Sequence, residues 1–280
     1  MADDQNCNFM EYNNKMAIVV VSCDKYSDLW DDVFNLLDIH WTDRPYKTYL
    51  ATDSKPYERK GVEVIHFGNI RQWMVCTRKA VERIDAEYIL FLMEDYFVIK
   101  NIDTKVIDED LAFMDKQQAD FINLHQKPHF LKEEDSQFET KDIRTIPNNT
   151  RYGLDTAGAI WRRDFFLEQL NREDGDAWRF EAILVGDSMS ENGIPGKLFF
   201  DTRKPLNLCP GEVVRLGKFT LDTVKIIEST GYKIQSTRAR MTKMEYYKDK
   251  LKGRLANIKH GRKLLKKIGR RFGFVFFTED

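Results

Sequence analysis

The sequence predicts an α/β fold in which a mostly parallel sheet is flanked by helices. The first observation is a set of short, continuously apolar runs, such as MAIVVVS at 16–22 and ILFLM at 89–93, which are typical of strands buried on both faces. The second is the helical spacing of the apolar residues between such runs, as in 73–84. Strands that alternate with helices favour a parallel sheet covered on both sides.

Each predicted element has its own signal along the chain. Residues 1–15 are polar without a clear period, and we expect a loose leader there. Strands are predicted at 16–22, 46–51, 62–67, 89–93, 121–124, 154–161 and 198–201, and helices at 29–37, 73–84 and 162–170. The polar, proline-containing segment 125–149 predicts a long loop. In the strand at 154–161, Gly158 would let a backbone or a ligand approach closely.

Composition indicates an ordinary globular protein. The chain has 280 residues, of which 42% are hydrophobic and 32% charged, enough for one large or two small domains. No stretch approaches the ~20 apolar residues of a membrane span. The start of the chain lacks the basic-then-apolar pattern of a signal peptide, so we expect a cytoplasmic location. The four cysteines show no CxxC spacing, which predicts reduced thiols rather than a disulfide or zinc framework.

Acidic side chains follow three of the predicted strands, at Asp24, Asp53 and Glu94-Asp95. They must lie where the strands leave the core, because an unpaired carboxylate inside it is very costly. Right-handed connections would bring these ends to one rim, and that rim is where α/β sheets bind ligands. Hard cations such as Mg²⁺ or Mn²⁺ prefer oxygen ligands and often share them with phosphates. The pattern predicts a nucleotide-diphosphate site; the alternative is a set of ordinary acidic turns.

The glycine-rich phosphate loops of two large enzyme classes are missing from the sequence. There is no GxGxxG after the first strand and no GxxxxGKS anywhere. This argues against a dinucleotide-binding fold and against a P-loop enzyme.

Three segments together resemble a known family. SCDKY after the first strand, YLATDSK at the second and a Trp-headed helix running into EYILFLMEDYF look like the GT-A glycosyltransferases, in particular the bacterial enzymes that build capsule and O-antigen polysaccharides. The likeness covers roughly 16–238. It implies a GT-A-like, Rossmann-like sheet and a nucleotide-sugar donor.

The resemblance also implies roles for particular residues. The base and ribose of the nucleotide would fall on Ser22, Cys23, Asp24 and Asp53. The family's Asp-x-Asp metal motif matches Met93-Glu94-Asp95, with Asp95 as its last carboxylate. Because Met93 cannot bind Mg²⁺, either Glu94 supplies the second contact or Asp95 acts alone, and metal independence stays open. Where such enzymes carry an arginine near the Trp-headed helix, this chain offers Arg71 and Arg78.

A second constellation is Trp178-Arg179-Phe180-Glu181. A carboxylate in partly desolvated, aromatic surroundings is suited to strip the proton from an acceptor hydroxyl, because its basicity is raised. Glu181 fits this role, and the family carries an aromatic-x-x-Glu run at the corresponding place. The alternative is an ordinary helix start with Glu181 near the helix dipole. Asp187 is the reserve candidate, and Lys218, beside Gly217, is either a diphosphate ligand or a solvated lysine.

The end of the chain differs sharply in charge from the rest. Residues 238–271 hold fourteen Lys or Arg against two acids, a net charge of +12, which leaves −13 for everything else because the whole chain carries −1. Apolar residues from Leu251 to Phe272 fall near one helical stripe. This predicts a basic amphipathic tail over 238–280 that docks on an anionic membrane. Nucleic acid is the less favoured partner, because the aromatics cluster at the terminus.

The sequence therefore predicts one GT-A-like domain at 16–237 followed by that tail. We expect a glycosyltransferase that moves a hexose from a nucleotide-sugar, most simply a UDP-sugar, to a lipid-linked oligosaccharide at the inner face of the cell membrane. Asp95, with or without Glu94, would hold Mg²⁺ or Mn²⁺, and Glu181 would act as the base of an inverting reaction. The alternatives are a sugar nucleotidyltransferase and a non-catalytic, sugar-binding membrane module.

Overall fold

The computed structural model describes residues 15–257. Two compact units divide the chain, the first ending at Cys209 and the second beginning at Pro210. The leader predicted at 1–15 lies outside the described residues except for Lys15, and so does the tail beyond residue 257. The boundary falls earlier than the one we predicted after residue 237, so the segment 210–237 groups with the C-terminal helix.

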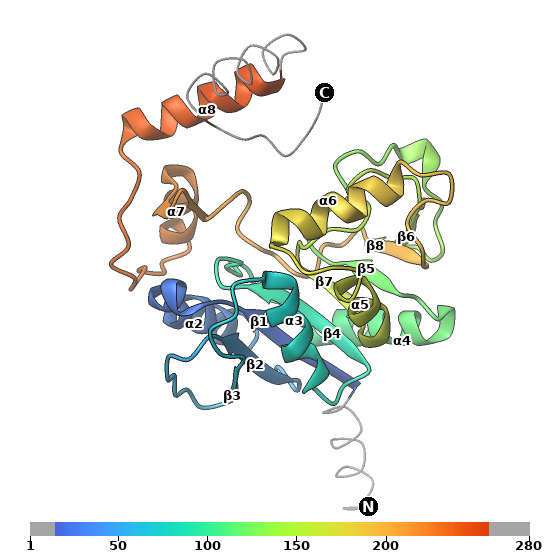
Figure 1. The fold of residues 1–280 in the computed structure, drawn as a ribbon, viewed down its shortest axis with the longest axis horizontal. Coiled ribbons are helices and arrows are strands. Elements are labelled where there is room, and N and C mark those ends of the chain that lie inside the picture. Colours follow the sequence, from blue (N-terminus) through green and yellow to red (C-terminus); the bar gives the residue numbers. More distant parts are fainter. Residues whose placement is uncertain (1–14, 258–280) are drawn as a thin grey trace, which may run out of the picture. The chain divides into compact units, whose positions relative to one another are not determined.

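The first unit is built on an eight-stranded sheet in the order β3-β2-β1-β4-β7-β5-β8-β6 (Figure 1). Only β7 and β6 run antiparallel to their neighbours, so the predicted mostly parallel sheet flanked by helices is confirmed. The strands are β1 Met16–Val21, β2 Lys47–Thr52, β3 Val62–His66, β4 Tyr88–Met93, β5 Phe121–Asn123, β6 Ile143–Ile146, β7 Ala159–Arg162 and β8 Leu198–Asp201.

The register of the sheet brings several strand ends to one edge. Val21, the last residue of β1, is level with Ala51 of β2 and with Met93 of β4. Strand β7 is antiparallel, and its first residue, Ala159, pairs with Asn123, the last residue of β5. The residues that follow β1, β2, β4 and β5, and those that precede β7, therefore lie along the same carboxyl edge.

Helices cover both faces of this sheet. They are α2 Trp30–His40, α3 Trp73–Glu82, α4 Thr104–Gln117, α5 Arg163–Leu170 and α6 Ala177–Ser188. Helices α3, α5 and α6 share one core cluster with alternate strand residues, which include Phe200 of β8. Phe199, which precedes Phe200 in β8, contacts Phe113 of α4 edge-on, with 5.0 Å between the ring centroids. Because successive strand residues point to opposite faces, α4 covers the other face.

An aromatic stack holds α6 against the sheet. Phe180 of α6 is fully buried and lies 5.5 Å from Trp73 and 6.3 Å from Trp161, measured between ring centroids. Burying a ring of this size contributes on the order of 1.5–3 kcal/mol. Asp176 caps the helix by accepting a hydrogen bond from Arg179 N at 2.7 Å. The sequence around 178–181 thus forms a well-anchored helix start.

Three stretches differ from the sequence-based expectation. The segment 125–149 is not one loop, because it contains the edge strand β6 and a short 3₁₀ turn, Glu133–Asp135. The predicted strand at 154–161 begins only at Ala159. Gly158 is required by packing rather than by a ligand, since a Cβ there would lie 2.3 Å from Leu206 Cδ2 and 2.9 Å from Leu208 Cδ1.

The second unit is small and helical. A short hairpin, β9 Val214–Arg215 and β10 Lys218–Phe219, precedes α7 Leu221–Ser229, and α8 spans Lys243–Asn257. Phe219 is fully buried and its backbone pairs with Ala239 and Met241. Helix α7 has no counterpart among the predicted elements.

Candidate active site

The turn after β1 is tied to the turn after β2 by Asp24. Its Oδ1 accepts hydrogen bonds from Ser54 N at 3.1 Å and Lys55 N at 2.9 Å, and its Oδ2 accepts one from Ser54 Oγ at 2.9 Å. Burial alone would raise the pKa of Asp24, but these hydrogen bonds outweigh it and lower that pKa. Asp24 N in turn donates to Asp53 Oδ2 at 3.0 Å. The Asp24 carboxylate therefore holds the edge together, while Asp53 shares only one oxygen with this network.

The pKa shifts of Cys23 and Cys76 indicate which carboxylates lie near these two thiols at this edge. Burial, followed by the negative charges of Glu94 and Asp53, raises the pKa of Cys23. Burial and Asp53 likewise raise the pKa of Cys76, to about 11. Cys23, Asp53, Glu94 and Cys76 therefore lie within electrostatic range of one another. A raised pKa favours the neutral thiol, so neither cysteine has the lowered pKa of an activated thiolate nucleophile.

Ser22 is buried at the end of β1, and its hydroxyl accepts a hydrogen bond from Trp30 Nε1 at 2.8 Å. This contact fixes the first turn of α2 against the strand end. Of the four residues predicted to contact the base and ribose, Ser22 and Asp24 are thus engaged in holding the edge, and Cys23 and Asp53 sit at its centre. The four do lie together, as predicted for one rim.

The candidate base Glu181 belongs to a polar cluster that bridges α6 and the loop before β7. Thr156 Oγ1 donates to Glu181 Oε1 at 2.8 Å, and the side chains of Thr156 and Tyr96 are hydrogen-bonded as well. Thr156 therefore contacts both the Tyr96 hydroxyl and the Glu181 carboxylate. The result is a chain of hydroxyls that ends on a carboxylate.

Asp155 is the second carboxylate of this cluster. Burial, opposed by a hydrogen bond from Ala157 N and assisted by the charge of Glu181, raises the pKa of Asp155 to about 7. Its Oδ1 accepts from Ala157 N at 3.1 Å and from Asn123 Nδ2 at 3.4 Å. One carboxyl group thus holds a proton near neutral pH beside another that can accept one, which is the arrangement of an acid–base pair.

Tyr96 links this cluster to the end of β4. Burial raises the pKa of Tyr96, and nearby negative charges raise it further. Those charges belong to Asp95, Asp155 and Glu181. Since the charges of Glu94 and Asp53 both act on Cys23, the run from Glu94 to Tyr96 connects the two halves of the edge, which we call the acidic rim.

The aromatic surroundings of Glu181 are not those that the sequence suggested. Trp178 is 75% exposed and Phe180 points into the core, so neither encloses the carboxylate. Tyr96 supplies the aromatic ring instead. The reserve candidate Asp187 is ion-paired with Arg172, whose Nη2 lies 2.9 Å from Asp187 Oδ1.

The three predicted cations have separate positions. Arg71 is exposed on the loop that enters α3, near the strand ends. Arg78 donates to Leu170 O at 3.3 Å and lies 3.5 Å from Asp174 Oδ1, so it ties α3 to the end of α5. Lys218 belongs to the second unit, where it pairs with Glu245 at 2.6 Å. Of the three, Arg71 alone is both exposed and on the acidic rim's side of the sheet.

A divalent cation would find an incomplete ligand set in the protein. Within residues 15–257, no three His, Cys, Asp or Glu side chains gather closely enough to hold a metal ion. Glu94 and Asp95 could supply one or two oxygens, and Mg²⁺ is commonly held by one or two carboxylates together with substrate phosphates. The residues therefore fit a cation that arrives with a diphosphate, and not a resident metal centre.

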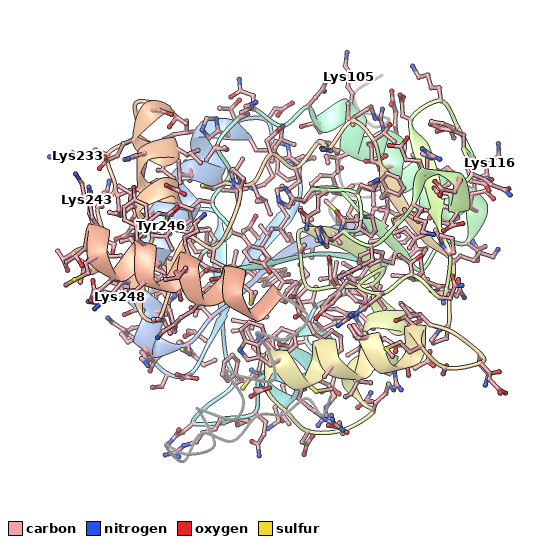
Figure 2. The ribbon with its side chains drawn as sticks, turned by 90° about the horizontal axis from the view of Figure 1, so that it is seen from above. Lys105, Lys116, Lys233, Lys243, Tyr246 and Lys248 are labelled. Carbon is pink, nitrogen blue, oxygen red and sulfur yellow. The ribbon has the colours of Figure 1, made fainter. Side chains whose placement is uncertain are left out.

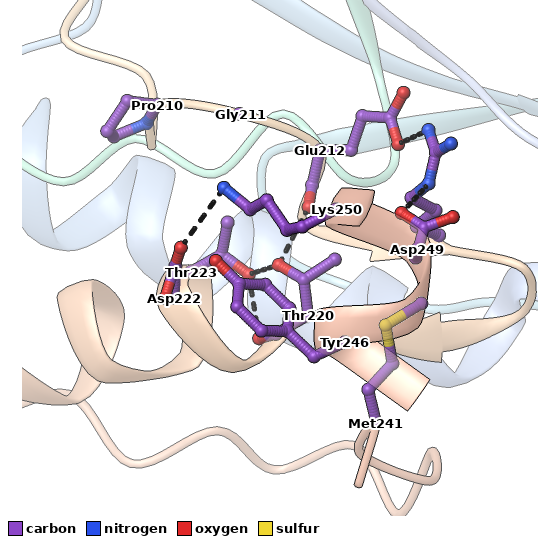
Figure 3. A pocket seen from close by; sticks show the side chains of 11 residues that line it. Pro210, Gly211, Glu212, Thr220, Asp222, Thr223, Met241, Tyr246, Asp249 and Lys250 are labelled. Carbon is purple, nitrogen blue, oxygen red and sulfur yellow. Dashed lines mark hydrogen bonds and ion pairs between the residues drawn. The ribbon is translucent and has the colours of Figure 1, made fainter. Parts of the chain in front are cut away.

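The second unit carries a separate cavity of about 400 Å³ between α7 and α8 (Figure 3). Its charged lining is internally paired: Arg215 contacts Glu212 and Asp249 at 2.6 Å each, and Lys250 lies 3.4 Å from Asp222. Thr220 and Thr223 are hydrogen-bonded to each other at 2.7 Å. With these charges and hydroxyls already engaged, the acidic rim of the first unit is the stronger candidate for chemistry.

Sequence reasoning missed Asp155, Thr156 and Tyr96. The signal was present in part, because Asp155 and Thr156 precede a small-residue strand and Tyr96 follows the acidic pair. Their meeting depends on β7 running antiparallel, which carries the start of that strand to the carboxyl edge. No local pattern in the sequence specifies that reversal.

No protein-family model matches the sequence, and the comparison with curated proteins finds no match. Among solved structures, the chain is similar to TarS of S. aureus in complex with UDP-GlcNAc, with 14% identity and a TM-score of 0.41 over 93% of this chain and 73% of that one. In another TarS structure, of residues 1–349, the match spans 60% of the TarS chain and 67% of this one, with 15% identity and a TM-score of 0.41.

Two further structures illustrate the breadth of the likeness. A cytidylyltransferase from Leptospira borgpetersenii matches with 12% identity and a TM-score of 0.39 over 62% of this chain and 71% of that one. The glycosyltransferase GlyE of Streptococcus pneumoniae matches with 14% identity and a TM-score of 0.38 over 79% and 62%. At identities and TM-scores this low, none of these likenesses assigns an activity to this chain.

Proposed function

We propose that this protein is a glycosyltransferase that moves a hexose from a nucleotide-sugar to a hydroxyl of an acceptor saccharide, with inversion and with Glu181 as the general base. The observation that carries the proposal is the continuous acidic rim. It joins Asp53 and Glu94 to Asp95, Asp155 and Glu181 along one carboxyl edge. Such an edge is where α/β sheets bind nucleotides, and a carboxylate with a prepared hydrogen-bond partner is what base catalysis needs.

Glu181 would act directly on the acceptor. Thr156 occupies Glu181 Oε1, which fixes the carboxylate and leaves Oε2 to accept the acceptor's hydroxyl proton. As that proton moves to Glu181, the acceptor oxygen forms a bond to the anomeric carbon. The bond from that carbon to the diphosphate oxygen breaks, and the leaving nucleoside diphosphate takes the electron pair.

Asp155 would act beside Glu181 as a carboxyl group whose charge changes near neutral pH. Burial raises the pKa of Asp155 to about 7, so this group loses its proton as pH passes that value and then places a negative charge near Glu181. A negative charge at this place attracts the proton that leaves the acceptor hydroxyl.

The leaving diphosphate carries negative charge that the acidic rim cannot stabilise by itself. A divalent cation held by Asp95 and Glu94 together with the phosphates would neutralise that charge when bound. Arg71, exposed near the strand ends, would add a cation from the protein. The base and ribose would lie toward Cys23 and Asp53.

The acceptor is proposed to be a lipid-linked oligosaccharide, reached from the membrane surface. None of the helices within residues 15–257 combines the length and apolar character that a membrane span requires. Helix α8 instead exposes Met244, Tyr247 and Leu251 by 65%, 68% and 57%. These three residues, the α8 stripe, lie at i, i+3 and i+7 on one face.

Lysines flank the α8 stripe. Lys243 and Lys248 project outward from α8 (Figure 2), and Lys252 is exposed one turn further on. An apolar stripe bordered by lysines suits an anionic lipid surface, where each basic side chain contributes about 1 kcal/mol. This supports peripheral docking at the inner face of the cell membrane.

A donor panel tests the proposed activity. The full chain is incubated with UDP-, GDP-, CMP- and dTDP-linked sugars, with and without Mn²⁺, and both thermal shift and sugar release are measured. A ligand that binds only the folded state raises the melting temperature. We expect one nucleotide class to stabilise the protein and to be consumed.

Adding nucleoside triphosphates together with sugar phosphates to this panel separates the two alternatives. A sugar nucleotidyltransferase would instead release pyrophosphate from a nucleoside triphosphate and a sugar phosphate. A non-catalytic module, which Met93 in the metal motif would suit, would consume no donor under either condition. Either result would overturn the transferase proposal.

A further inference from the structure

Two aromatic rings and a guanidinium group form an exposed platform on the two segments that flank β6, with Phe130 before this strand and Arg151 and Tyr152 after it. Phe130 is 49% exposed, and its ring stacks on that of Tyr152 with 5.8 Å between centroids and 21° between planes. The Arg151 guanidinium lies 5.1 Å from the Phe130 centroid and 5.5 Å from that of Tyr152. His129 meets Phe130 edge-on at 4.8 Å. We call Phe130, Arg151 and Tyr152 the aromatic platform.

The platform depends on an energetically unfavourable backbone conformation at Tyr152. Tyr152 has a φ of 54°, a left-handed conformation that is unfavourable for a bulky side chain by roughly 1–3 kcal/mol. The turn around it is tight, since Gly153 N donates to Thr150 O at 2.8 Å. A Cβ at Gly153 would lie 2.8 Å from Ile146 Cγ2. Such strained residues persist where the surrounding structure fixes them, and they concentrate at binding sites.

The Phe130 ring is held in place by the buried residue that follows it. Leu131, next to Phe130, is buried, and its N–H donates to Pro128 O at 3.0 Å. The chain therefore turns inward directly after Phe130 and leaves that ring at the surface. Phe130 is thus half-exposed but held in place, by its buried neighbour Leu131 and by the stacked ring of Tyr152. An exposed aromatic ring held in this way is suited to bind a ligand.

The platform lies close to the acid–base pair. Tyr152 precedes Asp155 by three residues, and three extended residues span at most ~11 Å. Leu154, between them, is buried, which fixes the connection to the core. The backbone of Tyr152 is therefore within this distance of the backbone of Asp155, whose side chain feels the charge of Glu181.

We propose that the aromatic platform is the saccharide-binding subsite for the acceptor, holding a sugar ring one or two units away from the hydroxyl that reacts. The proposal rests on the proposed transferase function. An aromatic face carries negative potential, which attracts the polarised C–H groups on the apolar face of a pyranose. Arg151 offers up to five N–H donors to hydroxyl groups or to an acidic substituent of that sugar.

The chain provides a matched control on the segment before β6, which also carries Phe130. Phe138 is 60% exposed and has the Arg144 guanidinium 4.5 Å from its centroid. It therefore has the same ring and the same kind of cation. Arg144 Nη2, however, already donates to Glu133 O and Ser136 O at 2.6 Å each. Phe138 should thus not bind saccharide as Phe130 does.

The test compares Phe130→Ala, Phe130→Trp and Phe138→Ala with the unaltered full chain. Saturation-transfer NMR with neutral and acidic oligosaccharides measures binding without any donor, and the acceptor KM and the hydrolysis of donor by water are measured separately. We expect Phe130→Ala to lose the saccharide signal and to raise the acceptor KM about tenfold. Phe130→Trp should retain both, Phe138→Ala should behave as the unaltered chain, and water hydrolysis should not change in any variant.

The outcomes distinguish the subsite from the transferase activity. If the unaltered chain uses no donor but its saccharide signal is lost in Phe130→Ala, the transferase proposal fails and the platform stands. The platform is overturned if the unaltered chain gives no saccharide signal. It is also overturned if Phe130→Ala binds normally, or if Phe138→Ala loses binding equally.

Discussion

At the scale of single residues, the account depends on two neighbouring carboxyl groups with different tasks. Glu181 accepts a hydrogen bond from Thr156 and stays available to a proton, while the pKa of Asp155 is raised to about 7 by burial and by Glu181. Groups whose environments separate their pKa values are the usual acid–base pairs of enzymes. The assignment of roles therefore follows from the environment and not from residue type.

Asp155→Asn should change the pH dependence of turnover more than its maximum. In the unaltered enzyme, kcat/KM should rise as pH passes about 7, because Asp155 then ionises and its negative charge attracts the proton that leaves the acceptor hydroxyl. The asparagine cannot ionise, so the variant should lack this inflection and lose about tenfold at pH 8, less than the ~100-fold or more expected for loss of the base itself. An unchanged inflection in the variant's pH–rate profile would show that another group produces it.

At the scale of elements, much of the sheet could be predicted from the sequence. Strands β1 and β4 are continuous apolar runs because both of their faces are buried, whereas β2 (KTYLAT) mixes apolar and polar residues. The carboxylates after all three strands mark where they leave the core. The sequence patterns of β7, β5, β8 and β6, which form the other half of the sheet, predict strands less clearly. Strand β6 has only four residues at the edge, where one-sided burial leaves no continuous run.

The candidate site was predictable for the same reason only in part. The sequence predicts Asp53, Glu94, Asp95 and Glu181 as site residues because each is an acid beside an apolar or aromatic run. Asp155 and Thr156 lie in a loop, and their position depends on the antiparallel direction of β7. Tertiary contacts also gave Arg78 and Asp187 partners that no local pattern could indicate.

A second carboxyl pair joins elements at another place in the sheet unit. Asp110 of α4 and Asp201 of β8 are fully buried, and Arg203 contacts both at 2.9 Å. Burial, and then Asp201, raises the pKa of Asp110 to about 9. Asp110 Oδ2 lacks a donor, and a proton retained there lets it donate to Asp201. The protonated form of Asp110 is therefore the one that the fold favours.

Asp110→Asn should make stability less dependent on pH. The folded pKa of Asp110 lies above its unfolded value of about 3.9, so the stability it contributes is complete below that value and is lost as pH rises toward about 9. The asparagine keeps the neutral form, so its free energy of unfolding relative to the unaltered chain should increase by up to ~1 kcal/mol per pH unit between pH 5 and 9.

Urea unfolding at pH 5, 7 and 9 measures this difference. Glu109→Gln is the control, because it removes an exposed ion pair to the same Arg203 and should change stability by ~0–1 kcal/mol at every pH. Equal pH slopes in Asp110→Asn and the unaltered chain would exclude a buried proton at this position.

At the scale of the whole molecule, the charge asymmetry of the chain underlies our proposal that its two units have different partners. The acidic rim belongs to the first unit and the α8 stripe to the second. An enzyme whose acceptor is held in a membrane gains by docking there, because its substrate is then concentrated at one surface. Docking and chemistry should consequently be separable by mutation.

Replacing Tyr247 and Leu251 with serine should weaken binding to vesicles that contain phosphatidylserine. The loss of apolar burial from two exposed side chains should reduce the bound fraction by at least tenfold in co-sedimentation of the full chain, while donor hydrolysis in solution is unchanged. Met189→Ser, which alters another exposed apolar residue, at the C-terminal cap of α6, is the control. Normal sedimentation of the double variant would assign docking to another surface.

The most direct test of the central claim is single-turnover transfer by Glu181→Gln, with nucleotide affinity measured on the same preparation. Glutamine keeps the size of the side chain and its hydrogen bond from Thr156, but it cannot accept the proton. The account predicts a fall in transfer of at least ~100-fold with nucleotide affinity within about twofold. Transfer at the unaltered rate, or an equal loss in Asp187→Asn with Glu181→Gln unaffected, would contradict it.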